Sequence, residues 1–312
     1  MPEPQNPLHA ALTGPYFSSR ILQEQSLPWR ALHTPGVLPV SQSIWRHVGS
    51  PADSPHYLKL LQGIHPEGVF SHETAAALWG MWMPWGNTGF SPVHLSKRRT
   101  DGGPPWRQGI KGHQLPPHAR ILDRVGVRVT SPAWTWVDLA GTRMSFEDLV
   151  AAGDSLLRRG NGPAGQREPG LHPLSGVEDI KATIAVRPKV KGIVRCREAV
   201  ELLRADHDSR PESLVRTRLL EAGLPEPTIN PVLRMSKGKT IQPDLAWIDL
   251  KVCIQYEGDH HRADKDQWHR DIGRDRTMHQ DGWVVLRLTS RDLESHQWQA
   301  FLGEVRQALG IV

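Results

Sequence analysis

Apolar and polar positions alternate in two short runs near the C-terminal end of the chain. The alternation predicts β-strands over Gln242–Asp249 and Val252–Glu257. Leu250 and Lys251 lie between these runs and predict a two-residue turn, so we expect a hairpin. One face of this hairpin carries the apolar side chains of a core, namely Leu245, Trp247, Val252, Ile254 and Tyr256.

The other face of the predicted hairpin carries acidic and amide side chains. A two-residue turn pairs position 249 with position 252, and the same register sets Asp244 opposite Glu257. Because opposite Cβ atoms lie about 5 Å apart, Asp244, Glu257 and the amide oxygen of Gln255 can converge on one hard cation. Two carboxylates this close repel each other unless a cation or a proton lies between them. The pattern therefore predicts a metal site on Asp244, Gln255 and Glu257.

Helical periodicity surrounds the predicted hairpin. We expect helices over 209–222, 264–280 and 296–309, and a further strand over 283–288. Ser209 and Glu212 have the spacing of a capping box, which gives Glu212 a structural explanation beside a catalytic one. The order of these elements predicts an α/β fold with a small mixed sheet flanked by helices.

The pattern further upstream predicts an α+β region. Helices are expected over 57–62 and 72–79, followed by strands over 93–96 and 108–114. Lys97, Arg98 and Arg99 would form the basic tip of the hairpin that these strands make. Two helices followed by such a hairpin are similar to a winged helix with its wing. The three cations are therefore candidates for contact with nucleic acid, and a solvated loop is the alternative.

The length of 312 residues suffices for two domains with a core each. Residues 1–50 are rich in proline and form a lead-in without an assigned fold, and residues 51–160 form the winged-helix-like region. The stretch 161–207 begins with a linker rich in Gly and Pro and continues with short helices. The α/β domain is expected to occupy residues 208–312.

The formal net charge is +5, and its distribution is uneven. Residues 1–211 hold 24 Lys and Arg against 18 Asp and Glu, whereas residues 212–312 hold 14 against 15. The basic excess in the first part favours contact with a polyanion such as DNA. No apolar run approaches the roughly 20 residues that span a bilayer, and the N-terminus lacks a signal-peptide pattern. We therefore expect a cytoplasmic protein without a membrane partner, and reduced thiols at Cys196 and Cys253.

A set of residues in the C-terminal region matches a known pattern. It comprises Glu212, Arg216, Leu219, Ala222-Gly223-Leu224-Pro225, Pro243-Asp244, Gln255-Tyr256-Glu257-Gly258, His260-His261 and Arg270-Asp271-Ile272. Over residues 209–295 these resemble the very-short-patch-repair (Vsr-like) endonuclease domain of the PD-(D/E)XK nuclease superfamily, in particular the branch named domain of unknown function 559 (DUF559). The resemblance implies a restriction-endonuclease-like fold and Mg²⁺-dependent hydrolysis of DNA phosphodiester bonds.

The resemblance also implies roles for the acidic residues. Asp244 and Glu257 would hold one or two Mg²⁺ ions with Gln255 as a neutral ligand, and Glu212 would assist from its helix. The triplet that usually reads Glu-Tyr-Asp-Gly in this family reads Gln-Tyr-Glu-Gly here. A Gln oxygen binds a hard cation more weakly than a carboxylate does. The alternative is therefore a DNA-binding, antitoxin-like regulator with an inactive nuclease fold, and a third reading is an interaction scaffold.

Basic residues after the hairpin receive further roles. His260 or His261 would take the proton of the attacking water or give one to the leaving oxygen, because imidazole titrates in the useful range. Arg262, Arg270 and Arg274 would contact the phosphate backbone. A zinc site on the histidines of this region would lack thiolates and regular spacing.

A second resemblance covers part of the N-terminal region. It rests on Ser71 to Pro84, Val93-His94-Leu95-Ser96, Thr130-Ser131-Pro132 and Asp138-Leu139-Ala140. These segments resemble the region often joined to the nuclease-like domain, which is similar to the winged helix of abortive-infection (AbiEi-type) antitoxins. This resemblance implies a DNA-binding module.

Overall fold

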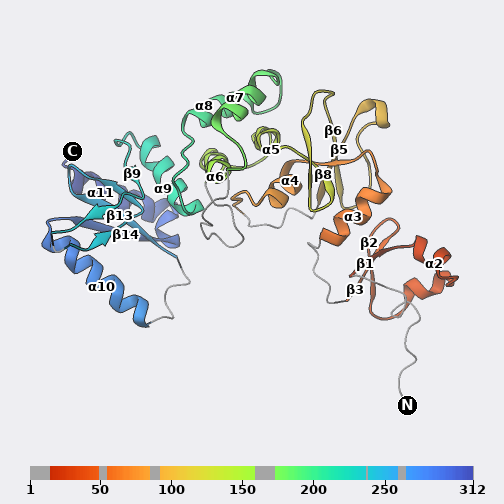
Figure 1. Cartoon of the computed structure of the whole chain (residues 1–312), viewed down its shortest axis with the longest axis horizontal. Coiled ribbons are helices and arrows are strands. Elements are labelled where there is room, and N and C mark those ends of the chain that lie inside the picture. The colour runs from red at the N-terminus through yellow and green to blue at the C-terminus, as the bar shows by residue number, and fades with distance from the viewer. Residues whose placement is uncertain are drawn as a thin grey trace, which may run out of the picture. The chain divides into compact units, whose positions relative to one another are not determined.

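A computed structural model describes residues 15–48, 55–84, 92–158, 173–236, 238–258 and 265–311, with 265–272 described by their backbone only. The chain forms two compact units (Figure 1). Unit 1 consists of residues 1–143 and 179–193, and unit 2 of residues 144–178 and 194–312. Residue 208, at which we expected the α/β domain to begin, lies inside unit 2.

Unit 1 begins with a small antiparallel sheet in the order β1-β3-β2. Its elements are β1 (Tyr16–Ser18), α2 (Arg20–Glu24), the 3-10 helix η1 (Trp29–His33), β2 (Val37–Ser41) and β3 (Ile44–His47). Phe17, Leu22 and Leu32 are buried together in its core. The segment that the sequence left as an unassigned lead-in thus contains a sheet, although its strands have only three to five residues.

The larger sheet of unit 1 is mixed and has the strand order β6-β5-β4-β8-β7. Its strands are β4 (Val69–Phe70), β5 (Val93–Lys97), β6 (Ile110–Gln114), β7 (Ile121–Arg124) and β8 (Val127–Thr130). The helical elements are α3 (Pro55–Ile64), α4 (His72–Trp79), the 3-10 helix η2 (Arg99–Asp101), α5 (Pro132–Leu139) and α7 (Val177–Ala185), which starts in unit 2. The bounds of α4 are those that the sequence predicts, and Gly80 ends this helix with a left-handed φ of +71°.

The predicted wing is wrong, because β5 and β6 run parallel. Val93 pairs with Ile110 and Lys97 with Gln114, so the chain returns to the start of β5 before β6 begins. Residues 98–109 make this crossover, and their Gly and Pro content looks like a turn in the sequence. The loop lies directly over β6, since a Cβ at Gly112 would lie 2.0 Å from the carbonyl oxygen of Pro105.

Unit 2 contains a four-stranded mixed sheet in the order β14-β13-β12-β9. Its strands are β9 (Thr228–Ile229), β12 (Leu245–Trp247), β13 (Val252–Glu257) and β14 (Val284–Thr289), and β10 (Leu233–Arg234) and β11 (Thr240–Ile241) form a separate pair. The helical elements are α6 (Phe146–Leu157), α8 (Ile193–Glu201), α9 (Arg210–Glu221), α10 (Lys265–Gln280), the 3-10 helix η5 (Ser290–Leu293) and α11 (Ser295–Leu309). Strands β9, β12 and β13 are antiparallel neighbours, and α10 connects β13 to the parallel strand β14. The expected α/β architecture, a small mixed sheet flanked by helices, is confirmed.

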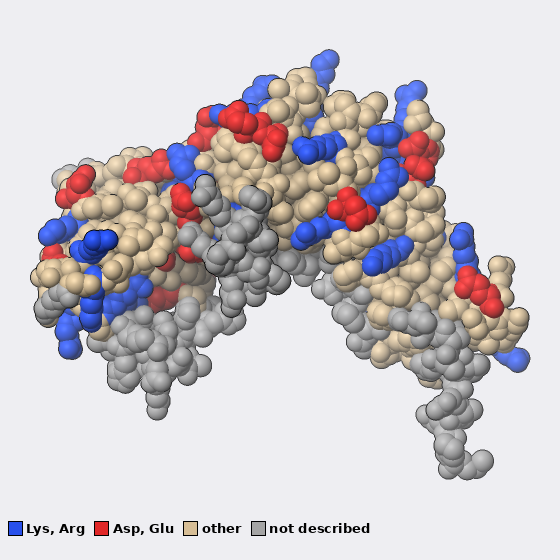
Figure 2. All heavy atoms as spheres, viewed as in Figure 1, with Lys and Arg blue, Asp and Glu red and all other residues tan. Residues whose placement is uncertain are grey.

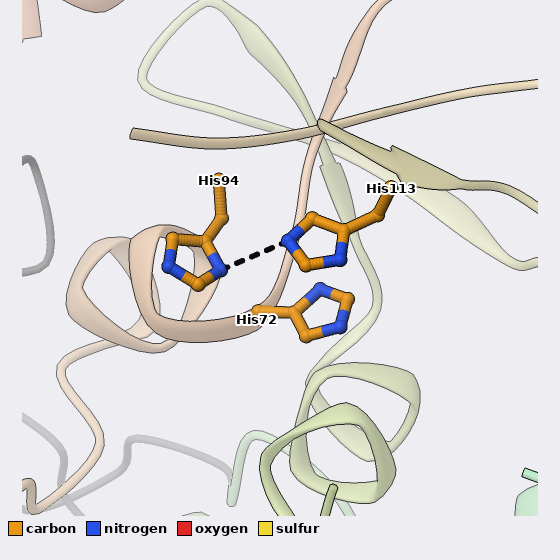
Figure 3. Close-up of side chains that lie close together, drawn as sticks. All are labelled: His72, His94 and His113. Carbon is orange, nitrogen blue, oxygen red and sulfur yellow. Dashed lines mark hydrogen bonds between the residues drawn. The ribbon is translucent and has the colours of Figure 1, made fainter. Parts of the chain in front are cut away.

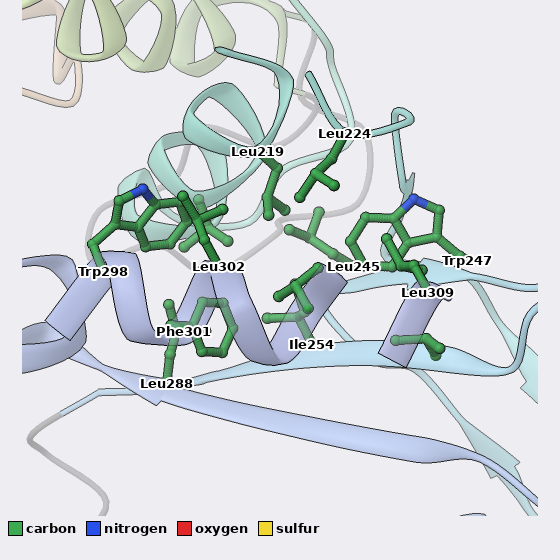
Figure 4. Packing of buried hydrophobic residues seen from close by; sticks show 13 residues of the cluster. Leu219, Leu224, Leu245, Trp247, Ile254, Leu288, Trp298, Phe301, Leu302 and Leu309 are labelled. Atoms are coloured by element: carbon green, nitrogen blue, oxygen red, sulfur yellow. The ribbon is translucent and has the colours of Figure 1, made fainter. Parts of the chain in front are cut away.

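Each face of this sheet has its own core. Leu245 and Ile254 face α9 and α11 and are buried with Leu219, Phe301 and Leu302 (Figure 4). Ala246 and Cys253 face the other way and are buried with Met278 of α10 and with Trp283. The alternation along β12 and β13 thus divides the side chains between two layers of helix, as the period-two pattern predicts.

The turn between β12 and β13 is longer than predicted. Leu245 pairs with Ile254 and Trp247 with Val252, so the turn contains the four residues 248–251. The prediction of a two-residue turn at Leu250 and Lys251 was therefore wrong. The observed strand pairing is shifted by two positions from the predicted pairing. A shift by an even number leaves every side chain on its predicted face and changes only its partner.

Helices α6 and α9 pack around a buried polar network. Asp154 of α6 accepts hydrogen bonds from Ser213 Oγ at 2.6 Å and from the backbone N–H of Arg204 at 2.7 Å. Arg216 of α9 lies 3.7 Å from the same carboxylate and donates to Glu226 at 2.8 Å and to His207 at 2.9 Å. The side chains of Asp154, Arg216 and His207 have no exposed surface. Their mutual contacts replace the water that such groups would otherwise need.

Two further expectations concern the chain as a whole. Cys196 and Cys253 are free and buried, which confirms that they are structural thiols. Burial raises the pKa of Cys253 to about 12, so this thiol is unreactive at neutral pH. Within the described ranges, every helix is too short or too polar to cross a lipid bilayer.

Candidate functional site

Asp244 lies just before β12 and makes two hydrogen bonds with the neighbouring strand. One carboxylate oxygen accepts from the side-chain amide of Gln255 at 2.8 Å, and the other accepts from the backbone N–H of Tyr256 at 2.6 Å. The structure thus brings together two of the three predicted metal ligands. The register makes Gln255, and not Glu257, the partner of Asp244 across the strands.

Glu257 is held by a different residue. Its carboxylate forms an ion pair with Arg287 of β14, which also binds Asp275 of α10 at 2.7 and 2.9 Å. The expectation that Glu257 faces Asp244 across a tight bend is therefore wrong. The side chain of Glu257 remains 43% exposed, so the ion pair is open to solvent.

Gln255 has a fixed orientation because its two ends meet partners of opposite kind. Its amide nitrogen donates to Asp244, and its oxygen accepts from Arg274 Nη2 at 2.7 Å. Arg274 also donates to the backbone oxygen of Gln242. The oxygen expected to bind a cation is thus turned toward a guanidinium group, and Arg274 is close to the site as predicted.

Glu212 approaches Asp244 from the first turn of α9. Its carboxylate accepts from Ser209 Oγ at 2.7 Å, from the backbone N–H of Asp208 at 2.8 Å and from Asn230 Nδ2 at 3.1 Å. The backbone N–H of Asn230 donates to the carbonyl oxygen of Asp244 at 2.8 Å. Asn230 therefore connects the two acidic residues, and the capping role expected for Glu212 holds in part, because Ser209 caps the helix.

The two acidic residues influence each other's ionisation. Burial, and next to it the negative charge of Glu212, raises the pKa of Asp244 to about 7. Burial also raises the pKa of Glu212. A half-buried acid beside a second acid is stabilised by a proton or by a cation, and a site of this kind suits acid–base or metal chemistry. The acidic pair of this site is thus Glu212 with Asp244, in place of the predicted pair of Asp244 with Glu257.

Four candidates from the sequence have side chains that the structure does not describe. His260, His261 and Arg262 lie outside the described residues, and for Arg270 only the backbone of α10 is described. Their assigned roles therefore stay predictions.

The basic candidates Lys97, Arg98 and Arg99 belong to unit 1. Lys97 ends β5, Arg98 donates to the carbonyl oxygen of Pro117 at 3.3 Å, and Arg99 is exposed at the start of η2. The crossover loop that they open also carries Trp106, whose surface is 99% exposed. On the face drawn in Figure 2, basic and acidic side chains are interspersed among the coloured residues, so charge alone does not mark a binding surface there.

Sequence reasoning missed two features that the fold creates. Arg287 interrupts the apolar strand β14, and this interruption was the available signal for a buried or paired charge.

The second feature is a cluster of histidines. His72, His94 and His113 lie together in unit 1 (Figure 3), with nitrogen atoms within 4.8 Å of one another. Their irregular spacing in the sequence gives no sign of this cluster, because the parallel pairing of β5 with β6 produces it.

Comparison with known proteins adds two distant relatives. Two Mycobacterium tuberculosis proteins, from strains CDC 1551 / Oshkosh and ATCC 25618 / H37Rv, are each 26% identical to this chain over 180 residues. The match covers 56% of this chain and 61% of each relative, and both relatives are described as uncharacterized. No family model and no solved structure matches the chain.

Proposed function

We propose that the protein is a metal-dependent DNA endonuclease of the PD-(D/E)XK type, with its active site at Glu212 and Asp244. The observation that carries this proposal is the convergence of Glu212, which is buried, on Asp244, which is half-buried; burial first and the charge of Glu212 second raise the pKa of Asp244 to about 7. Asp244 directly precedes β12 of a mixed sheet flanked by helices, and Glu212 lies on α9, one of these helices; this is the architecture expected from the Vsr-like resemblance. Hard oxygen donors of this kind suit Mg²⁺.

The two carboxylates fit a Mg²⁺ ion because the ion's positive charge would relieve the repulsion between them. Glu212 and Asp244 would hold the ion, which would polarise a phosphoryl oxygen of the substrate and make a bound water more acidic. The hydrogen bonds from Gln255 and Tyr256 orient the carboxylate of Asp244, and those from Ser209 and Asn230 orient that of Glu212. Arg274 carries a positive charge at the edge of the site, where it can steady a phosphate group.

DNA binding by unit 1 is the second part of the proposal. Arg99 and Trp106 are exposed on the crossover loop between β5 and β6, and Arg107 follows directly. An exposed aromatic ring on the same loop as an exposed guanidinium group suits contact with nucleic acid, since the cation binds phosphates and the ring stacks on bases. The winged-helix reading of this unit rests on the AbiEi-type resemblance and on α3 and α4, and it does not include a wing from β5 and β6.

A second candidate function is a DNA-binding regulator whose nuclease fold is inactive. It is favoured because acidic side chains that would bind a metal already have partners within the protein. Both oxygens of Asp244 accept hydrogen bonds, and Glu257 is neutralised by Arg287. In this reading Gln255 and Arg287 replace the cation as the partners of the acids.

A nicking assay on supercoiled plasmid with Mg²⁺ or Mn²⁺ separates the two candidates. The nuclease proposal expects cleavage by the wild type and its loss in Asp244→Ala and in Glu212→Gln. Asp249→Ala is the matched control, because this acid is exposed in the turn of the same hairpin. Cleavage that survives both active-site substitutions would overturn the assignment of the site. DNA binding without cleavage in any of these metals would favour the regulator.

A further inference from the structure

Three histidines of unit 1 come from three different elements. His72 opens α4, His94 lies on β5 and His113 lies on β6. The rings of His72 and His113 stack with centroids 3.6 Å apart, and the rings of His94 and His113 have centroids 5.0 Å apart (Figure 3). This cluster, which we call the histidine triad, is separate from the acidic site of unit 2.

The fold holds the triad together by contacts outside the rings. Ser71 Oγ bonds to Ser96 Oγ at 2.7 Å, and the backbone N–H of Ser71 donates to the carbonyl oxygen of His94 at 3.1 Å. Thr74 Oγ1 accepts from the backbone N–H of His94 at 2.8 Å. These bonds fasten the first turn of α4 to β5, so His72 and His94 are placed side by side.

The backbone at His72 is in an uncommon conformation. Its φ is +50°, in the left-handed region that residues other than glycine rarely adopt. Such conformations concentrate at functional sites, where the surrounding structure maintains them. At this position the conformation accompanies the stacking of His72 on His113.

His94 Nδ1 has two close neighbours, and it cannot form a hydrogen bond with both. It lies 2.8 Å from Glu73 Oε2 and 3.1 Å from His113 Nε2. With a proton it can donate to only one of these atoms, and without a proton it can accept from His113 but leaves Glu73 without a donor. Among the described side chains, Glu73 Oε2 is buried without an aligned hydrogen-bond donor. A cation among these atoms would accept one lone pair from each of the three.

Carboxylates lie beside two of the three rings, in different ways. Glu73 contacts Nδ1 of His94, the nitrogen that also faces His113, so Glu73 is a candidate ligand and not a partner behind the ring. Asp138 Oδ2 lies 3.7 Å from His72 Nδ1, which leaves Nε2 of His72 for an ion. Asp138 is itself held by Arg187 at 2.5 Å. Imidazole ligands of metals commonly have a carboxylate partner of this kind, which orients the ring and increases its basicity.

An ion can reach the triad from solvent. His94 is 4% exposed, whereas His72 and His113 are partly open to solvent and give an ion access.

We propose that His72, His94 and His113 bind a divalent transition metal, with Zn²⁺ as the best-suited ion. Imidazole nitrogens suit Zn²⁺, Co²⁺, Ni²⁺ and Cu²⁺, whereas Mg²⁺ prefers oxygen. Tetrahedral Zn²⁺ with bonds of about 2.0–2.1 Å places its ligand atoms roughly 3.3 Å apart, close to the 3.1 Å between His94 Nδ1 and His113 Nε2. The ring of His72 turns off His113 to complete the set, and the fourth position is left for a water molecule or Glu73.

Metal binding by the full-length protein tests this proposal. After removal of metal with a chelator, titration with Zn²⁺ against a chromophoric competitor is expected to give one ion per chain at this site. Titration with Co²⁺ is expected to give the visible absorption of tetrahedral coordination, a readout that does not depend on any activity. His113→Ala and His72→Asn are expected to weaken Zn²⁺ binding by more than about 100-fold, because each removes a ligand and not only a group that supports one.

The control is His118→Ala, since His118 is exposed in unit 1 and outside the triad. Circular dichroism of each apo variant identifies those that remain folded, and a folded His113→Ala or His72→Asn protein decides the outcome. If neither folds, nitrogen NMR of the wild-type imidazoles during Zn²⁺ titration decides instead, with shifts expected at His72, His94 and His113. Absence of Zn²⁺ and Co²⁺ binding to the wild type, or equal affinity in His113→Ala and His118→Ala, would overturn the proposal.

Discussion

The side-chain amide of Gln255 donates a hydrogen bond of 2.8 Å to the carboxylate of Asp244 across β12 and β13. A residue that the resemblance implies to be a metal ligand thus acts as a donor to its neighbour, and its oxygen is bound by Arg274. The charge at position 255 therefore decides whether the site contains two acids or three.

Replacing Gln255 by Glu removes this donor and adds a negative charge beside Asp244. In the presence of EDTA we expect the free energy of unfolding to fall by about 1–3 kcal/mol, because Asp244 loses a partner and gains a repulsive neighbour. Millimolar Mg²⁺ is expected to recover this loss, as read by urea unfolding. Gln307→Glu, at an exposed position of α11, is the matched control and should not respond to Mg²⁺. A Gln255→Glu protein that is equally stable with and without Mg²⁺ would count against a cation site.

The pKa of Asp244 predicts a pH dependence of stability. The folded protein retains this proton up to about pH 7, whereas an unfolded chain releases it near pH 4. The stability that this group contributes is therefore present below about pH 4 and is lost as the pH rises to about 7. In Asp244→Asn this dependence is absent. The variant should gain in stability relative to the wild type between pH 4 and pH 7, measured by urea unfolding at several pH values. A constant difference between the two proteins over that range would contradict the assignment.

The buried pair of Asp154 and Arg216 predicts a large loss of stability. Asp154→Ala leaves Arg216 without one of its buried anionic partners and removes the acceptor of Ser213. We expect the free energy of unfolding to fall by about 3–5 kcal/mol, and Arg216→Met in the same chain to recover part of it. Asp249→Ala, at an exposed turn position, should change stability by no more than about 0.5 kcal/mol. A loss in Asp154→Ala as small as in this control would show that the network is not needed.

The exposed loop of unit 1 predicts how DNA affinity depends on salt. Arg99→Ala should reduce the slope of log affinity against log salt by about 1, because one phosphate contact is lost. Trp106→Ala should weaken binding to single-stranded DNA by about 1–3 kcal/mol per stacked base while leaving the slope unchanged. Fluorescence anisotropy with labelled DNA measures both. Arg120→Ala and Trp29→Ala, also exposed in unit 1, are the matched controls. Equal effects of the loop and control substitutions would place the contact elsewhere.

The sequence predicts well those features that depend on local periodicity. The alternation of β12 and β13 gave the correct face to Asp244, Gln255 and Glu257, and the bounds of α4 were correct to the residue. The register in which two strands pair is harder to predict from the sequence. The turn at 248–251 has four residues where two were expected, because no Asn-Gly or Gly pair marks its length. The partner of Asp244 was wrong for this reason alone.

Features that depend on whether two strands run parallel or antiparallel could not be predicted from the sequence. A stretch with Gly102, Gly103, Pro104 and Pro105 reads as a tight turn, and nothing in these residues reveals that it crosses over to a parallel strand. That crossover carries His113 to His94, so the histidine triad could not be predicted without it. The approach of Glu212 to Asp244 likewise depends on how α9 packs on the sheet, which the resemblance indicated and the periodicity did not.

The chain passes between the two units at residues 143, 178 and 193, so neither unit is a single uninterrupted segment. A cut in the stretch 159–172 or at residue 208 separates α6 from α9 and divides the network around Asp154 between two fragments. The N-terminal fragment made in this way would expose the apolar side chains of α6 to solvent. The C-terminal fragment would contain the guanidinium group of Arg216 without its partner Asp154. Excising either half by one scission is therefore expected to yield aggregation, and dissection of this protein calls for point substitutions in the intact polypeptide.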